Sequence, residues 1–181
     1  MKQFIQRNLK RFGLEIQRSG FRRDVMDFIA DRDIDLVLDV GANTGQFGEA
    51  LREKGYRRRI VSFEPIPAVF QALATKAMAD GDWTVNNFAL GAAAEQATIN
   101  VSEASVFSSI LPSRTAAAGF NDTAAVTRTE TIEVRRLDDV FPALSGNVLL
   151  KIDTQGYERQ VLEGGARSLA KVNGVLMELP I

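Results

Sequence analysis

The chain contains no cysteine and no histidine, and each absence excludes several kinds of chemistry. Without cysteine there is no disulfide framework, thiolate zinc site, iron–sulfur cluster or cysteine nucleophile. Without histidine there is no Ser–His catalysis, no imidazole-ligated metal and no access to the commonest general base. An enzyme made from this chain must therefore take its general base from another residue type.

An excess of one charge and long apolar runs are missing as well. The 22 lysines and arginines nearly balance the 23 acidic residues, so no cationic excess indicates a nucleic-acid partner. No apolar run approaches the ~18–20 residues of a membrane span. The charged first residues also lack the apolar core of a secretory signal. With 181 residues, 45% of them hydrophobic, we expect about one domain, located in the cytoplasm and without a transmembrane segment.

The N-terminal residues are predicted to form an amphipathic helix. Its apolar side chains recur at steps of four, three and four and share one face: Ile5, Leu9, Phe12 and Ile16. A basic helix of this kind can lie on an anionic membrane, whereas packing against the domain or a partner subunit is the commoner arrangement. We expect residues 1–31 to form a helical leader, with a second helix over residues 24–30.

Beyond this leader, apolar runs of strand length alternate with segments of helical periodicity. Runs that are apolar almost throughout suit strands buried on both faces, as in a parallel sheet covered by helices. Five sheet strands are predicted, at residues 35–40, 60–63, 83–89, 148–153 and 174–179. Helices are predicted at residues 47–54, 69–78 and 157–169. The alternation predicts an α/β fold, with a Rossmann-like, mainly parallel sheet and helices on both faces.

This alternation pauses in the middle of the chain. Residues 97–101 and 131–134 alternate like the strands of a small antiparallel insertion. Residues 105–130 are rich in Ala, Ser and Thr without a clear period, which is typical of a functional loop, a lid or disorder. We therefore expect an insertion or lid at about 97–135, within a domain spanning 32–181.

Acidic side chains lie at the ends of three predicted strands. Asp39 lies near the end of the first strand, Glu64 follows the second, and Asp153 ends the fourth. Ligands of open α/β sheets bind beyond this carboxyl edge. Gly41 and Gly45 flank the turn after the first strand, so its backbone can approach a ligand closely. Glu64 lies 23 positions after Gly41, where nucleotide-binding folds place the acid that accepts hydrogen bonds from ribose.

The acid before the glycine turn favours S-adenosylmethionine over a dinucleotide. A dinucleotide site requires G-x-G-x-x-G, whose second glycine lets the backbone reach the pyrophosphate. That position is Asn43 here, and Asp39 precedes the turn. A carboxylate repels a pyrophosphate but attracts the ammonium and sulfonium groups of S-adenosylmethionine. An NAD-linked oxidoreductase, or a glycine turn that binds nothing, are the alternatives.

Several ordered motifs resemble the FkbM family of S-adenosylmethionine-dependent methyltransferases. The resemblance covers roughly residues 24–181 and rests on the residue 83–91 stretch and on the runs LDVGANTGQFGEALREKGY, IVSFEP and LLKIDTQGYERQVLEGG. It implies a class I methyltransferase fold. It also implies O-methylation of a hydroxyl group on a sugar, a glycan or a secondary metabolite, so the expected partner is a small-molecule or glycan substrate.

The resemblance also implies roles for individual residues. The cofactor loop would contain Asp39, Gly41, Asn43 and Gly45, with Glu64 on the ribose and Asn87, Phe88 and Ala89 bordering the adenine. Asp153 would face the transfer site. With no histidine available, Asp153 is the first candidate for the general base and Glu158 the second. Alternatively, Asp153 only orients the methionyl amine or caps the following helix. Both acids offer oxygen ligands for Mg²⁺, but no ligand set is fixed and no metal is predicted.

The sequence departs from the family pattern in two places. Gln155 stands where the K-I-D-x-E-G-x-E pattern usually has glutamate, although Glu158 matches. The family fold normally continues into two more strands, whereas this sequence ends at Ile181. We expect a truncated form that lacks these strands. The alternatives are a homo-oligomer, formed through the fifth-strand edge or the N-terminal helix, and a cofactor-binding protein with impaired catalysis.

Overall fold

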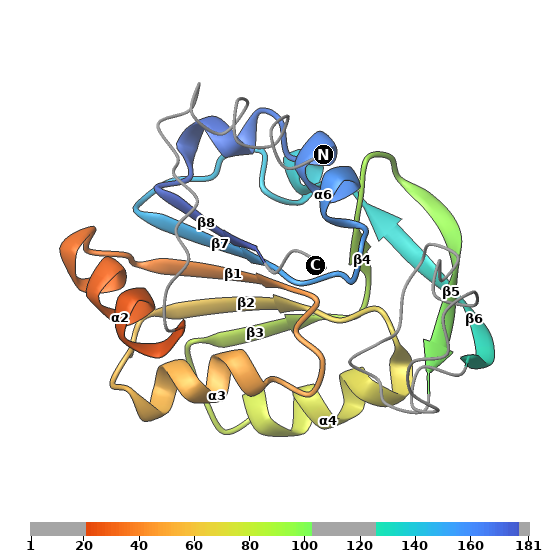
Figure 1. The fold of residues 1–181 in the computed structure, drawn as a ribbon, viewed down its shortest axis with the longest axis horizontal. Helices are drawn as coiled ribbons and strands as arrows, with labels where there is room; N and C mark the ends of the chain where they lie inside the picture. Colours follow the sequence, from red (N-terminus) through yellow and green to blue (C-terminus); the bar gives the residue numbers. More distant parts are fainter. Residues whose placement is uncertain (1–20, 103–125, 178–181) are drawn as a thin grey trace.

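A computed structural model describes residues 21–102 and 126–177, and a five-stranded parallel sheet forms its centre (Figure 1). Across the sheet the strands are β3 (Trp83–Asn86), β2 (Arg59–Phe63), β1 (Leu36–Val40), β7 (Val148–Ile152) and β8 (Gly174–Met177). This order confirms the predicted Rossmann-like α/β fold. The helix predicted at residues 5–16 and most of the 105–130 stretch lie outside the described residues.

The two central strands are buried along their whole length. Every residue of β1 and of β7 is buried, which is the burial that their near-continuous apolar sequences predict. Val40 pairs with Phe63 on one side and with Ile152 on the other, so β1, β2 and β7 end level with one another. The loops that follow these strands therefore meet at one edge of the sheet.

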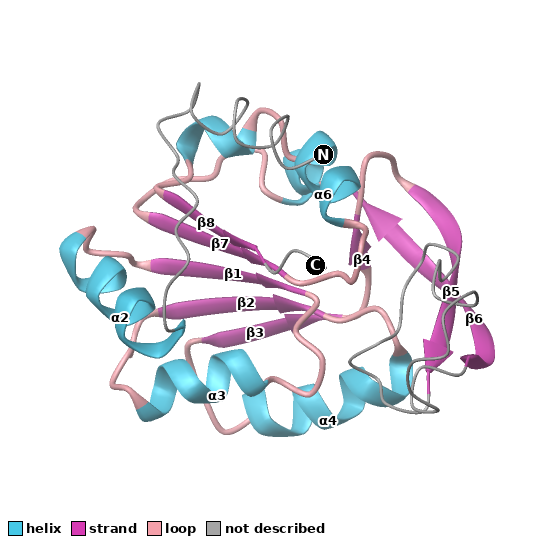
Figure 2. Ribbon diagram, viewed as in Figure 1, coloured by secondary structure: helices cyan, strands magenta, loops and turns pink. Residues whose placement is uncertain are grey.

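Helices cover both faces of the sheet (Figure 2). On one face lie α2 (Phe21–Asp31), α3 (Gln46–Glu53) and α4 (Pro67–Ala77), which pack Ile29, Leu51 and Leu73 against the sheet residues Val37, Ile60 and Leu149. On the other face lie α5 (Leu137–Val140), α6 (Glu158–Gly164) and the 3₁₀ helix η4 (Ser168–Lys171), which pack Leu137, Val161 and Leu169 against Leu38, Val61 and Leu150. The predicted second helix, at residues 24–30, corresponds to α2.

A second, three-stranded sheet lies beyond the carboxyl ends of the central strands (Figure 1). Its strands are β4 (Ala89–Leu90), β6 (Val126–Arg135) and β5 (Glu95–Ser102), with β5 antiparallel to β6 as expected of the insertion. Its apolar face packs against Ile66, which follows β2. At its other end, Gly164 of α6 approaches Gly91 so closely that an added Cβ would lie 1.8 Å from the Gly91 carbonyl oxygen.

Two predicted elements have different ends in the structure. The third strand was expected to reach Ala89, but β3 ends at Asn86 and Ala89 belongs to the second sheet. The helix expected over residues 157–169 ends at Gly164, and η4 follows as a separate turn. Gly165 caps α6 by donating its backbone N–H to the carbonyls of the preceding turn.

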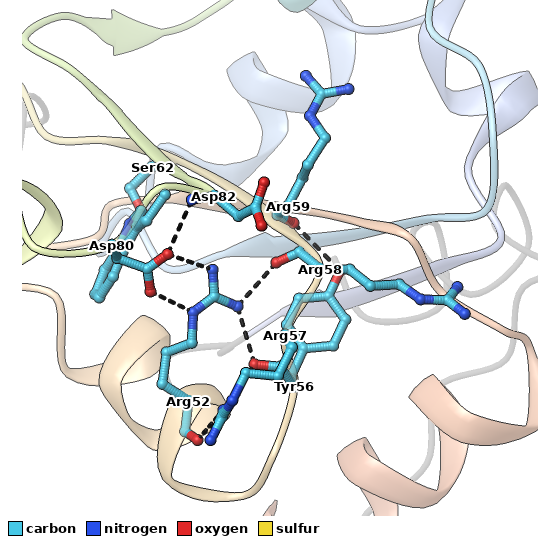
Figure 3. Close-up of polar contacts among 9 residues, drawn as sticks. Arg52, Tyr56, Arg57, Arg58, Arg59, Ser62, Asp80 and Asp82 are labelled. Atoms are coloured by element: carbon cyan, nitrogen blue, oxygen red, sulfur yellow. Dashed lines mark hydrogen bonds and ion pairs between the residues drawn. The ribbon is translucent and has the colours of Figure 1, made fainter.

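At the opposite edge, Arg52 ties together the loops that precede β2 and β3 (Figure 3). Its guanidinium forms a bidentate pair with Asp80, with Nε 2.5 Å from Oδ2, and donates to the carbonyl oxygens of Tyr56 and Arg58. These contacts join α3 to the amino ends of two strands. In the part of the chain that the structure describes, no helix has the length and apolar character that crossing a membrane requires.

Candidate active site

The turn after β1 is built from residues with left-handed backbone conformations. Gly41, Asn43 and Gly45 have φ angles of 74°, 50° and 90°. A Cβ on Gly41 would lie only 1.9 Å from the carbonyl oxygen of Asp153, so this position has no room for a side chain. The backbone N–H groups of Gly41 and Ala42 donate to the carbonyl of Phe63. The turn is therefore packed between the chain segments that follow β2 and β7.

Glu64 fixes this turn through backbone hydrogen bonds. Its Oε2 accepts from the N–H of Asn43 and its Oε1 from the N–H of Ile66, each at 2.9 Å. The residue is only 5% exposed, and burial raises the pKa of its carboxyl group to about 7. The side chain predicted to take the ribose thus also anchors the glycine turn to the start of α4.

Asp39 is fully buried and lies beside a buried cation. The Nζ of Lys151 is 3.0 Å from Asp39 Oδ1, an ion pair without hydrogen-bond geometry. Ser62 donates its hydroxyl to Asp39 Oδ2 at 3.3 Å, and Trp83 donates its indole N–H to Ser62. Lys151 also donates to the carbonyl oxygen of Gly41 at 3.0 Å. One lysine therefore connects the acid before the turn with the turn itself.

Asp153 lies at the end of β7 with its carboxylate held from two sides. Its Oδ1 accepts from Nε2 of Gln155 at 2.8 Å, and its Oδ2 is 3.6 Å from Nζ of Lys151. Its side chain is 29% exposed, in contrast to the buried Asp39. Among the predicted site acids, Asp153 is therefore the one whose carboxylate remains open to a substrate.

Glu158, the second predicted base, holds the turn between β7 and α6. It is 7% exposed, and its Oε1 accepts hydrogen bonds from the backbone N–H groups of Thr154 and Gly156 and from the Thr154 hydroxyl. Both N–H groups belong to the turn that precedes α6, so Glu158 stabilises that turn. These contacts support a structural role for Glu158, while its role as a base stays a prediction.

The site lies within a known domain. A family model described as the methyltransferase FkbM domain matches residues 39–179. The chain belongs to this family. No curated protein matches the sequence. The matched segment begins at Asp39 and contains Glu64, Lys151 and Asp153. Membership of the family identifies the chain as a methyltransferase.

The residues expected to border an adenine in the FkbM domain already contact other residues of the protein. Asn87 donates its side-chain amide to the carbonyl oxygens of Glu64 and Pro65, at 2.9 and 3.1 Å. The centroid of the Phe88 ring lies 5.5 Å from that of the Phe63 ring. Cζ of the Arg135 guanidinium lies over the Phe88 ring, 4.3 Å from its centroid. Because a cation covers this ring, its packing does not support stacking on adenine. The assignment of Asn87, Phe88 and Ala89 to the cofactor stays a prediction.

The sequence did not predict the contacts that two cations of this FkbM domain make, those of Lys151 with Asp39 and Asp153 and that of Arg135 with Phe88. Lys151 interrupts an otherwise apolar buried strand, and a charge in such a run is the signal that a buried partner exists. Arg135 alternates with apolar residues on β6 and gives no such signal. The structure brings Asp39, Glu64 and Asp153 to one edge of the sheet, as their positions near the ends of parallel strands predict.

Proposed function

We propose that this FkbM domain transfers a methyl group from S-adenosylmethionine to a hydroxyl group of a sugar, glycan or secondary metabolite. The observation that carries the proposal is the charge pattern at the carboxyl edge of the sheet. Three acids, Asp39, Glu64 and Asp153, surround a left-handed glycine turn, and the nearby cation Lys151 is shared between two of them.

This charge pattern fits a cationic cofactor better than a phosphorylated one. Lys151 is 3.0 Å from Asp39 and 3.6 Å from Asp153, so its charge is already compensated. Carboxylates would repel a pyrophosphate at the turn, and this lysine, already paired with two of them, would not offset the repulsion. S-adenosylmethionine carries an ammonium and a sulfonium, which carboxylates attract.

The proposed cofactor contacts are those of the turn and of the neighbouring strand ends. Asp39, Gly41, Asn43 and Gly45 would form the cofactor loop, with Glu64 placed for the ribose hydroxyls. S-adenosylmethionine, when bound, supplies a methyl group that an oxygen nucleophile attacks in line without a covalent enzyme intermediate. The chain contributes positioning, which can lower such a barrier by ~7–11 kcal/mol.

Asp153 is the proposed general base. Its carboxylate is partly exposed, whereas Asp39 is buried and Glu64 accepts two backbone N–H bonds. A proton from the acceptor hydroxyl would pass to this carboxylate as the oxygen attacks. We further propose that residues 32–181 form the methyltransferase domain, preceded by a helical leader. In this proposal the 97–135 insertion excludes water from the transfer site.

Calorimetry and a transfer assay test the proposal. We expect S-adenosylhomocysteine to bind and NAD not to bind, and we expect radioactive methyl groups to pass from S-adenosylmethionine to members of a panel of hydroxylated sugars and glycans. Binding of NAD in place of S-adenosylhomocysteine would refute the cofactor assignment. Cofactor binding without transfer to any acceptor would favour the alternative, a catalytically impaired methyltransferase-like protein.

A substitution at the proposed base separates binding from chemistry. D153N keeps the size of the side chain but removes its proton-accepting charge, so turnover should be lost while the affinity for S-adenosylhomocysteine stays within a few-fold. Glu163→Gln on the exposed side of α6 is a control that removes a charge away from the site. Turnover of D153N close to the wild-type rate would show that Asp153 is not the base.

A further inference from the structure

Strands β2, β1 and β7 lie side by side at the centre of the parallel sheet, and a row of three buried polar side chains crosses them (Figure 1). Ser62 and Lys151 are the two register partners of Asp39. Side chains alternate between the two faces of a strand, so all three lie on the face where the apolar residues two positions earlier pack under α2, α3 and α4. The row therefore lies inside the core, close to the carboxyl ends of the strands.

Stability alone does not account for this polar row. Burying an ion pair costs hydration free energy, and apolar residues of similar volume often replace such a pair without a loss of stability. The pair of Asp39 and Lys151, with Nζ 3.0 Å from Oδ1, is of this kind because both residues are buried. The other contacts of the ammonium group therefore decide what its charge contributes.

The ammonium group of Lys151 contacts two further segments of the chain at the carboxyl edge of the sheet. Its Nζ donates to the carbonyl oxygen of Gly41 at 3.0 Å, in the glycine turn, and lies 3.6 Å from Oδ2 of Asp153, the proposed base. Asp39 compensates its charge from inside the core, and the ring of Phe47, 5.6 Å from Nζ, lies beside it from α3. One buried cation thus links the turn after β1 with the carboxylate after β7.

We propose that Lys151 is a positioning residue for methyl transfer, an inference that rests on the proposed function. An ammonium group carries three N–H donors on one nitrogen, so it can contact acceptors from several segments at once. By contacting the Gly41 carbonyl and the Asp153 carboxylate, Lys151 fixes the proposed cofactor turn relative to the proposed base. The rate of an in-line transfer depends on how accurately the reacting groups are held, so loss of this link should lower kcat.

Comparison of D39N with the double variant D39N/K151M separates this role from a purely structural one. D39N keeps the lysine but leaves its charge uncompensated in the core, whereas the double variant buries neither charge and should have the higher melting temperature. The kcat values should follow the opposite order, with that of the double variant lower by about tenfold or more, because methionine cannot link Gly41 to Asp153. A stable double variant with a kcat equal to or above that of D39N would overturn the positioning role.

The absence of cysteine from the chain permits a second test by chemical rescue. The single thiol of K151C is alkylated in urea with 2-bromoethylamine, which rebuilds a side chain of the same length that ends in an ammonium group, and the protein is then refolded. Alkylation with iodoacetamide gives the matched neutral control, and wild type taken through both treatments measures recovery. We expect kcat within a few-fold of the wild type for the ammonium form only. Equal kcat values for the two alkylated forms would contradict a role for the charge.

Binding of S-adenosylhomocysteine, measured by calorimetry, tests the contact with the turn independently of turnover. D39N/K151M lacks the hydrogen bond to the Gly41 carbonyl, so it should bind several-fold more weakly than D39N. K76M, which removes a partly exposed cation of α4, should keep the affinity and the kcat of the wild type. Equal affinities of D39N and the double variant would overturn the link with the turn. If the wild type binds S-adenosylhomocysteine but methylates no acceptor, the proposed transfer fails, and these affinities still decide whether Lys151 positions the turn.

Discussion

Gly41 joins the loop after β1 to the loop after β7, and its missing side chain is what allows the contact. The variant G41A would place a Cβ 1.9 Å from the Asp153 carbonyl oxygen at a φ of 74°. Because a backbone atom blocks the site, we expect a loss of about 3 kcal/mol or more in the free energy of unfolding. Urea unfolding measures this loss, and calorimetry measures the accompanying loss of S-adenosylhomocysteine binding.

The control for this prediction is G55A. Gly55 has a φ of 95° but no atom within 4 Å of an added Cβ, so it isolates the cost of the backbone conformation. That cost should be about 1–2 kcal/mol. If G41A and G55A destabilise the protein equally, the close approach of the two loops is not what requires glycine at position 41.

Glu64 should make the stability of the protein depend on pH. Burial raises the pKa of its carboxyl group from the ordinary 4.5 to about 7, so the folded protein holds this proton more tightly than the unfolded chain. The contribution of Glu64 is therefore complete below about pH 4.5 and is lost as the pH rises through 7. At ~1.4 kcal/mol per pKa unit, the loss is about 3 kcal/mol.

The variant E64Q removes this titration and leaves the others in place. Relative to the wild type it should gain about 3 kcal/mol in the free energy of unfolding between about pH 4.5 and pH 8, measured by urea unfolding at each pH. The glutamine has one acceptor oxygen for two N–H donors, so its stability at acid pH should start below that of the wild type. E53Q, on the exposed end of α3, should show no such trend.

At the scale of helices and strands, burial on both faces is the feature that the sequence records most clearly. The runs predicted at residues 35–40, 60–63, 148–153 and 174–179 correspond to β1, β2, β7 and β8. Each run is apolar because side chains on both faces pack under helices. Local composition therefore predicts these elements, although each of β1, β2 and β7 contains one buried polar residue, Asp39, Ser62 and Lys151 respectively.

The predicted ends of β3 and α6 were wrong because these ends depend on contacts between residues, which local composition does not record. β3 ends at Asn86, and the side-chain amide of the next residue, Asn87, donates to the carbonyl oxygen of Glu64 in the chain after β2. The adjacent asparagines Asn86 and Asn87 are the signal in the sequence for this change of sheet, because asparagine is depleted in strands and favours turns. The end of α6 also had a signal, because Gly164 and Gly165 are adjacent and helix ends favour glycine.

For the candidate site, the sequence predicts which acids lie at one edge of the sheet, but it does not predict the ion pairs that they form. Parallel strands that end level must bring Asp39, Glu64 and Asp153 to one edge, and this follows from their positions at or just after the ends of apolar runs. The sequence could not show that Lys151 lies between two of these acids, because partner identity depends on strand order. The negative charge of the predicted acids is thus partly neutralised by Lys151.

For the whole molecule, the pair of Lys151 and Asp39 lies where the strand order reverses. β1 and β7 are the neighbours on either side of this point, and the pair joins the half containing β2 and β3 to the half containing β8. Both residues are buried, at 8% and 0% exposure. Removing one partner leaves the other as an uncompensated buried charge. Water cannot reach this charge, so the free energy of unfolding falls.

We therefore expect K151M to lose about 3–5 kcal/mol in the free energy of unfolding, and the neutral double variant D39N/K151M to lose much less. The partly exposed pair of Lys76 and Glu49, 2.7 Å apart, is the control, and K76M should cost no more than about 1 kcal/mol. Urea unfolding of the four proteins, wild type included, measures these differences. Equal losses for K151M and the double variant would mean that the lysine acts through packing and its hydrogen bond to Gly41, because then neutralising Asp39 would restore nothing.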